Sequence, residues 1–238
     1  MKKIPVIVLM AVVMVLPVFA QEDDEQTIEQ LYLQNSVQSQ IIRAEAYSND
    51  QDMKMIAISD IQMMIEDGKV EQDDPIILQV LFDLGQEGIS RQVREQGHVI
   101  NDFPIVRKEA CRLLGEVGGD QARAFLTNIL LTDPEPMVMS EAVIALAKCG
   151  SDDTTRTQRV MAASMYRQTA TKRDNNFAVA FLNAVEIMFK SGDEITDPFL
   201  FEEIIKIADP SSGYRTIVQK RAIVLLKVLQ GQDFEEKD

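Results

Sequence analysis

Two stretches of the sequence, VRKEACRLLGEVG (106–118) and VMSEAVIALAKCG (138–150), decide the fold. They agree at five of thirteen positions, which are Val, Glu, Ala, Leu and the closing Gly. In both, apolar residues recur at i, i+4, i+7, i+8 and i+11, a spacing that places them on one face of a helix. The shared Ala lets a neighbouring helix approach closely, and the closing Gly can adopt the left-handed conformation that ends a helix. Both stretches are therefore predicted to be helices of one repeated type.

The same spacing recurs at 180–188 and 218–229, with a weaker copy at 57–65, and the four clear copies start 32, 42 and 38 residues apart. Each copy follows another amphipathic segment, and breakers such as Asp133-Pro134-Glu135-Pro136 separate the two members. The earlier segments lie at about 27–47, 75–85, 120–131, 154–168 and 197–208. The predicted unit is a helical hairpin of about 32–42 residues, present about five times, which indicates a solenoid.

These residues support a family resemblance. The segment 103–150 resembles HEAT repeats, of the HEAT-like type also found in bacterial lyase-related repeat proteins, and weaker copies extend over most of 50–231. The resemblance implies a right-handed all-α solenoid that binds proteins. In later copies Met139, Phe181 and Gln219 replace the Arg of the family pattern, so the copies depart from an Arg ladder between repeats. The pattern itself is matched by Val106, Arg107, Ala110, Leu113, Leu114 and Gly118.

The first twenty residues, MKKIPVIVLMAVVMVLPVFA, have the layout of a secretory signal peptide. Lys2 and Lys3 precede an apolar run, and a cut after Ala20 would leave an acidic Glu22-Asp23-Asp24-Glu25 start. The alternative is a membrane anchor, because the apolar run approaches the roughly 20 residues that span a bilayer. We expect cleavage after Ala20 and a periplasmic or secreted chain, 21–238, with no membrane span.

The charge balance argues against a nucleic-acid partner. The chain carries 38 acidic and 24 basic residues, a net charge of −14, which becomes −16 without Lys2 and Lys3. Such a chain repels phosphate backbones. The charge is also uneven, since residues 21–90 contain 16 acidic and 3 basic residues.

The sequence offers little for catalysis or metal binding. One His and two Cys cannot build a His-rich or Cys-rich metal site, and no nucleotide-binding or nucleophile motif is present. The register places Cys111 and Cys149 about 13 Å apart, beyond the roughly 7 Å limit for a disulfide. We predict free thiols and no catalytic, metal or cofactor-binding residues.

Residues 86–104 form an insertion between the two helices of the second hairpin, because a HEAT turn needs only a few residues. We expect a loop, with a short helix at 89–95. The cations of the insertion and of the next helix predict a cationic spot that binds a partner. The alternative is a solvated loop with internal salt bridges to Glu95 and Asp102. The cations are Arg91, Arg94, His98, Arg107, Lys108 and Arg112.

A second candidate surface crosses the second helices of the hairpins. Several residues outside the predicted core face are apolar, which suggests a groove for a partner helix or peptide. The alternative is that these residues pack against first helices of adjacent hairpins. The candidates are Met139, Ile144 and Phe181.

Together these features favour a non-enzymatic scaffold or adaptor, a monomer on its own, that binds another protein of a bacterial cell envelope. A second hypothesis is an enzyme or enzyme accessory of the lyase-related group, which would need a ligand-sized pocket containing His98 or Cys111. A third is an oligomer assembled end to end, which repulsion between the acidic ends at 22–25 and 233–238 disfavours.

Overall fold

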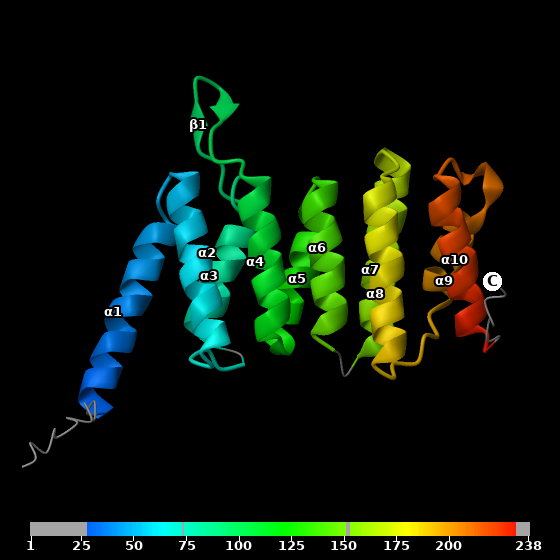
Figure 1. Cartoon of the computed structure of the whole chain (residues 1–238). Helices are drawn as coiled ribbons and strands as arrows, with labels where there is room; N and C mark the ends of the chain where they lie inside the picture. Colours follow the sequence, from blue (N-terminus) through cyan, green and yellow to red (C-terminus); the bar gives the residue numbers. More distant parts are fainter. Residues whose placement is uncertain (1–27, 73, 151–152, 232–238) are drawn as a thin grey trace, which may run out of the picture. The chain divides into compact units, whose positions relative to one another are not determined.

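A computed structural model describes residues 28–231, apart from 73, 151 and 152. Its regular structure is helical except for one short hairpin of strands (Figure 1). The elements are α1 (Ile28–Ala46), α2 (Gln51–Glu66), α3 (Pro75–Gly85), β1 (Arg94–Glu95), β2 (His98–Val99), α4 (Pro104–Val117), α5 (Gly119–Thr132), α6 (Pro136–Lys148), α7 (Thr154–Thr171), α8 (Asn175–Lys190), α9 (Pro198–Ala208), the 3₁₀ turn η1 (Pro210–Ser212) and α10 (Thr216–Leu229).

The chain divides into two compact units, residues 1–36 and 37–238. Only the first half of α1 represents the first unit among the described residues, and the description below concerns the second unit. The predicted signal peptide, 1–20, lies outside the described residues and stays a prediction.

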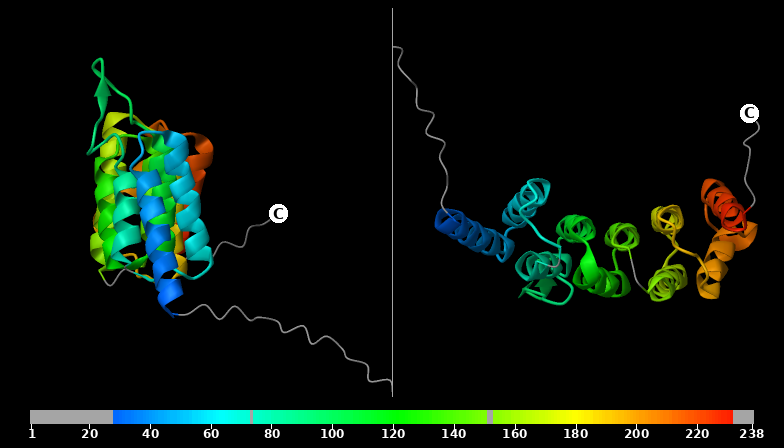
Figure 2. Two further views of the ribbon diagram at one scale, coloured as in Figure 1. Left: turned by 90° about the vertical axis from the view of Figure 1, so that its left-hand side faces the viewer. Right: turned by 90° about the horizontal axis from the view of Figure 1, so that it is seen from below.

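The helices of the second unit form consecutive hairpins, which pair α3 with α4, α5 with α6, α7 with α8 and α9 with α10, and α2 packs before them against α4. The second helices α2, α4, α6, α8 and α10 lie side by side, and the first helices α3, α5, α7 and α9 form another row (Figure 2). This arrangement confirms the predicted all-α solenoid of helical hairpins, four of which are complete in the second unit. The right-handed sense implied by the family resemblance stays a prediction.

Aspartates begin many of these helices. The side chains of Asp50, Asp74, Asp153, Asp174 and Asp197 accept hydrogen bonds from backbone N–H groups in the first turns of α2, α3, α7, α8 and α9. Such caps satisfy donors that a helix cannot pair internally, and they place negative charge at the positive end of the helix dipole. In α3 and α9 a proline follows the Asp, where its missing N–H costs nothing. These aspartates therefore fix where the five helices begin.

The core lies between the two rows of helices and follows the predicted repeat pattern. Val106, Ala110 and Leu114 of α4 are fully buried, as are their α6 counterparts Val138 and Ala142. Small residues bring α4 and α6 together.

Gly115 marks the closest approach of these two helices. A Cβ added there would lie 2.7 Å from the Ala145 Cβ and 2.9 Å from its Cα. Gly118 and Gly150, which close the two repeats, both have positive φ angles, of +71° and +66°. Both closing glycines thus have the positive φ that favours Gly, but Gly118, with ψ of −163°, is not in the predicted left-handed helical conformation.

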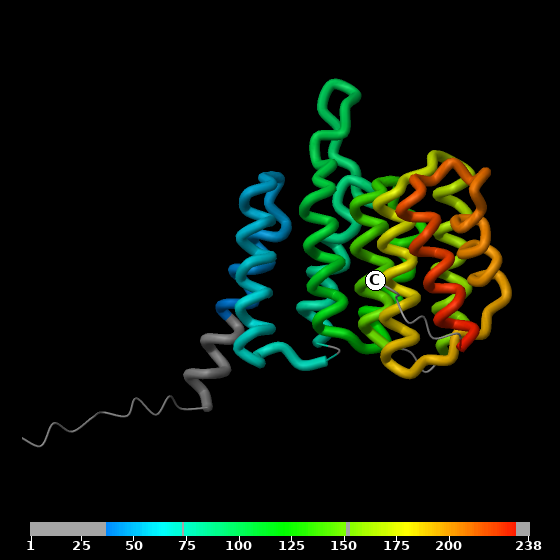
Figure 3. The backbone as a smooth tube through the Cα atoms, turned by 45° about the vertical axis from the view of Figure 1, so that its right-hand side comes forward, coloured from blue at the N-terminus to red at the C-terminus, as the bar shows by residue number. Residues whose placement is uncertain are grey.

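The insertion begins and ends as predicted, but it contains no helix at 89–95. Instead β1 and β2 pair antiparallel, with Arg94 opposite Val99, and stand beyond the ends of the neighbouring helices (Figures 1 and 3). Gln96 and Gly97, the two turn residues, have φ angles of 49° and 87°. This is the conformation that a tight two-residue hairpin turn requires, and it competes with helix formation.

The last hairpin leaves part of its packing surface uncovered. At one position of the second helices, Cys111, Val143 and Val185 are fully buried, whereas the equivalent Ile223 of α10 is 40% exposed. Nothing in the described chain packs on the far side of α10 as α8 packs on α6. The C-terminal hairpin is therefore an open end of the solenoid.

Candidate functional site

The insertion is held at its base by Glu87. The Lys54 ammonium, buried on α2, lies 3.1 Å from Glu87 Oε2 and donates a 2.7 Å hydrogen bond to the Ala46 carbonyl. From α4, Arg107 Nη1 donates to the Glu87 carbonyl at 3.1 Å. Two buried cations from two different second helices thus bind the same residue of the insertion.

Asn101 connects the two ends of the insertion. Its buried side chain donates to Glu87 Oε1 and to the Arg91 carbonyl, both at 2.7 Å, and accepts from the Val93 N–H at 2.8 Å. All three of these hydrogen bonds join residues of the insertion, so the Asn101 side chain links its first and last parts. The hairpin is therefore a fixed element of the scaffold.

Arg107 belongs to the core. It is fully buried, with Nε 2.7 Å from Asp133 Oδ2 and Nη1 2.5 Å from Asp102 Oδ1. Burial alone would lower the pKa of Arg107, but the hydrogen bonds that it donates to the Asp102 and Asp133 carboxylates outweigh this effect and raise the pKa, so the guanidinium stays charged. The prediction that Arg107 contributes to a surface spot is wrong, because these two carboxylates hold it inside.

Lys108 and Arg112 are partly exposed but are already paired. Lys108 Nζ lies 2.9 Å from Glu109, and Arg112 bridges Glu109 at 2.8 Å and Glu116 at 2.6 Å. The two cations lower the pKa of Glu109 despite its partial burial, which acts the other way. On α4 the predicted positive charge is therefore largely neutralised.

Three predicted cations remain on the insertion itself. Arg91, Arg94 and His98 are exposed, and Arg94 donates within the hairpin to the Gly97 carbonyl at 3.1 Å and to Gln92 Oε1 at 2.7 Å. The structure therefore divides the proposed cationic spot into an exposed group on the insertion and a paired group on α4.

Met139 and Phe181 are also core residues. Both are buried, because their positions on α6 and α8 face the neighbouring hairpin and not solvent. The prediction that they form an exposed apolar row is wrong, and the alternative, packing within the solenoid, holds for both. Ile144 is half-buried and lines the cleft described below.

An apolar row does cross the second helices, two positions earlier in the repeat. Its members occupy one position in all five second helices, and four of them are 41–76% exposed while the fifth, on α8, is half-buried. They are Ile56, Ile105, Met137, Val179 and Ile217. The signal was present in the sequence, since the last four of these residues are separated by the repeat spacings of 32, 42 and 38 residues already seen, and Ile56 holds the equivalent place in the weaker copy. We call them the apolar row.

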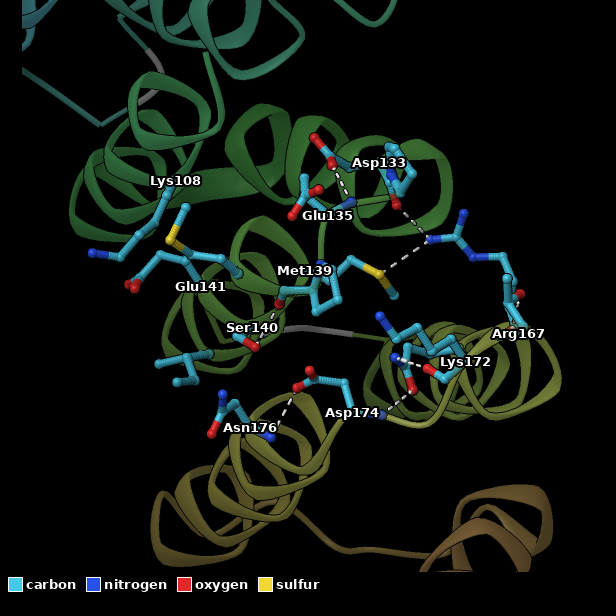
Figure 4. Close-up of a pocket in the computed structure, with 16 residues that line it drawn as sticks. Lys108, Asp133, Glu135, Met139, Ser140, Glu141, Arg167, Lys172, Asp174 and Asn176 are labelled. Carbon is cyan, nitrogen blue, oxygen red and sulfur yellow. Dashed lines mark hydrogen bonds between the residues drawn. The ribbon is translucent and has the colours of Figure 1, made fainter. Parts of the chain in front are cut away.

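A cleft of about 860 Å³ opens beside this row, between the α5–α6 turn, α6 and the α7–α8 turn (Figure 4). Arg167 of α7 reaches into it, with Nη2 3.6 Å from Met139 Sδ and hydrogen-bonded to the carbonyls of Leu130 and Asp133 at 2.9 and 3.0 Å. A second guanidinium thus contacts the turn that Arg107 contacts from α4. Where the repeat has Met139 and not Arg, the cation comes from a first helix.

The cleft has both charges in its lining. Glu135 and Glu141 lie on the α6 side and Lys172 on the α7 side (Figure 4). Burial raises the pKa of Glu141, although Lys108 opposes the effect. Met137 belongs to both the cleft and the apolar row, so the two form one continuous surface.

A comparison with protein families decides the identity of the repeats: residues 98–164 match the family model of HEAT repeats. This segment of the chain therefore consists of HEAT repeats. The match covers the insertion's second strand, α4, α5, α6 and the first part of α7. No curated protein and no solved structure matches the chain. HEAT repeats form helical scaffolds for protein interaction.

The possible catalytic residues of the chain lie apart from the cleft. His98 is exposed on β2, and Cys111 is fully buried between hairpins, where burial raises its pKa well above the ordinary value. Burial also raises the pKa of Cys149, to about 11. Both cysteines are free thiols. The described cleft therefore lacks the arrangement that the enzyme hypothesis requires.

The described HEAT helices were also compared with the length and hydropathy of membrane-spanning helices. None of those within the described residues is long and apolar enough to cross a bilayer.

Proposed function

We propose that this HEAT-repeat protein is an exported, non-enzymatic scaffold that binds another protein of the cell envelope. The observation that supports it best is the apolar row, which places an apolar side chain at the same position of every second helix, exposed in four of them and half-buried on α8. Scattered exposed apolar residues are normal on a protein surface, but an ordered line of them is typical of a binding surface. Export rests on the sequence of residues 1–20 alone.

The rigid insertion supports the same proposal. Its base is fixed by Lys54, Glu87 and Arg107, while its exposed end presents Arg91 and Arg94. Functional loops on repeat scaffolds are often held in this way. The insertion enters α4 just before Ile105, so it would contact a partner that lies on the apolar row.

Site-specific photo-crosslinking in the native cell tests this function. A photoreactive amino acid placed at Ile105 or Ile217 should capture the same discrete protein, and one at Ala124, exposed on α5 of the other row of helices, should not. Equal crosslinking from all three positions, or none from the first two, would contradict the proposal.

The export part is tested separately by the mass of the purified chain from the cell envelope. A mature protein that begins at Gln21 would support cleavage after Ala20. An uncleaved chain would instead favour the membrane anchor.

The double variant Arg91→Glu with Arg94→Glu measures how much the insertion contributes to partner binding, and it leaves the buried Arg107 in place.

A further inference from the structure

A second line of residues runs parallel to the apolar row, one helical turn further along each second helix. Positions i and i+4 of a helix lie on the same face, so the two lines are adjacent. The members of the second line are Asp60, Glu109, Glu141, Asn183 and Arg221. We call it the polar row. Within the described part of the chain, it carries unpaired acidic residues on α2 and α6, an acidic residue paired with Lys108 and Arg112 on α4, a neutral residue on α8 and a basic residue on α10.

The negative part of the polar row is incompletely neutralised. Glu109 is paired with Lys108 and Arg112, but within the described residues neither Asp60 nor Glu141 has an ion pair. Asp60 instead lies close enough to Glu45 to raise the pKa of that carboxyl, in addition to the effect of burial. Cationic groups of a binding partner, placed near Asp60 and Glu141, would stabilise both carboxylates.

The opposite end of the row has the opposite charge. Helix α10, TIVQKRAIVLLKVL, contains three cations and no acidic residue. Lys220 is exposed and has no ion pair in the described part of the chain, while Arg221 has one contact of 3.4 Å with Glu186. A ligand that fits the whole row therefore needs cations at one end and anions at the other.

The spacing of the apolar row favours a helical partner. Packed helices are about 8–10 Å apart, so the row presents one apolar group about every 10 Å. A helix returns to nearly the same face every seven residues, about 10.5 Å. A strand covers that distance in about three residues, and because its side chains alternate, successive contacts would point to opposite sides. A partner helix can therefore direct one apolar residue of each heptad towards the apolar row, whereas a strand cannot.

We infer that the partner binds through an amphipathic α-helix of about four heptads, with basic residues over α2 and α6, uncharged residues over α4, where Glu109 is already paired, and acidic residues over α10. This inference rests on the proposed function and specifies the partner's chemistry. One apolar residue per heptad contacts Ile56, Ile105, Met137, Val179 and Ile217 in turn. Basic residues of the same helix lie near Asp60 and Glu141, and acidic ones near Lys220 and Arg221.

Synthetic peptides test the inference directly. Three helical peptides of about 28 residues would share the apolar heptad positions and differ in their flanking charges: Lys in one half and Glu in the other, Glu throughout, or neutral Gln throughout. Fluorescence anisotropy with the purified chain, at low salt to limit screening, should give at least about tenfold tighter binding of the mixed peptide than of the all-Glu peptide.

Charge reversal on the protein supplies the matched test. Asp60→Lys with Glu141→Lys should remove the preference for the mixed peptide. The control, Glu71→Lys with Glu194→Lys, makes the same change in net charge at exposed positions in the α2–α3 and α8–α9 turns and should keep it. Circular dichroism would verify that both variants are folded. Equal affinities for the three peptides, no binding of any peptide, or equal effects of both double variants would overturn the inference.

The inference and the proposed function can fail separately. If crosslinking from Ile105 and Ile217 captures a protein whose yield Asp60→Lys with Glu141→Lys leaves unchanged, the scaffold stands and the helical, charge-matched partner does not. If neither position captures a protein, the proposed function fails regardless of the peptides.

Discussion

Arg107 shows how one side chain can join three segments of a repeat protein. It lies on α4, its carboxylate partners lie in the insertion and in the α5–α6 turn, and it binds the backbone at Glu87. A fully buried cation costs desolvation energy, which is offset here by two charged partners. Removing it would leave Asp133, also buried, without a countercharge.

We expect Arg107→Met to lower the free energy of unfolding by about 3–5 kcal/mol, because an uncompensated buried charge remains. Urea denaturation followed by circular dichroism measures the change. Arg94→Met, at an exposed position of the same region, is the control and should change stability by less than about 0.5 kcal/mol. A similar small effect for Arg107 would mean that it is not part of the core.

Glu141 gives a prediction with a pH dependence. Its pKa is raised in the folded protein, mainly by burial, so the folded state binds the proton more tightly than the unfolded state. The ionised carboxylate therefore opposes folding above the folded pKa, and the cost disappears as the pH falls through that pKa.

Glu141→Gln should consequently raise the melting temperature at pH 7, and the gain should shrink towards pH 4. Calorimetry at a series of pH values measures this. Glu109→Gln is the contrasting variant: the pKa of Glu109 is lowered, so its loss should reduce stability at pH 7. A gain for Glu141→Gln that is independent of pH would show that packing, and not charge, is responsible.

The sequence predicted Arg107 as a family residue but not its burial. The repeat pattern is local, whereas its partners Asp102 and Asp133 are 5 and 26 residues away and approach only when the hairpins stack. The same limitation explains Met139 and Phe181, since a helical period shows which residues share a face but not which face a neighbour covers. The apolar row was detectable, because its members recur at the repeat spacing.

At the level of the helices, Gly115 determines how closely α4 and α6 pack. Gly115→Ala places a Cβ against the backbone of Ala145 and not against a flexible side chain, so the helices must separate. We expect a loss of about 1–3 kcal/mol in unfolding free energy. Thermal denaturation tests it, with Ala145→Gly in the same chain as a partial rescue. An unchanged melting temperature would contradict the close approach.

The helices and their pairing were predictable because apolar period, aspartate caps and closing glycines all agree. The insertion was not, because its fold depends on a two-residue turn at Gln96-Gly97 and on the side chain of Asn101. A polar segment of this kind has no apolar period from which to infer its structure. Its hairpin is fixed by long-range contacts to Lys54 and Arg107.

For the whole molecule, the charge pattern of the polar row and the spacing of the apolar row both result from the stacking of repeated hairpins. Equivalent positions of successive second helices lie side by side, so the residues at one position of the five helices form one continuous surface. The acidic N-terminal third and the acid-free α10 give that surface a direction. Neither property belongs to a single hairpin, which is why a search for catalytic motifs in the sequence could not find this candidate site.

The open end at Ile223 has a consequence for how the molecule comes apart. Each hairpin is stabilised mainly by its neighbours, and α10 has a neighbour on one side only. Amide hydrogens of α10 should therefore exchange with deuterium well before those of α4 and α6, which mass spectrometry of peptic fragments measures. Equal exchange rates along the chain would indicate one cooperative unit. Under mechanical tension, the hairpin of α9 and α10 should separate from α7 and α8 at a lower force than α6 separates from α4 and α8, because fewer residues join it to the rest of the described chain.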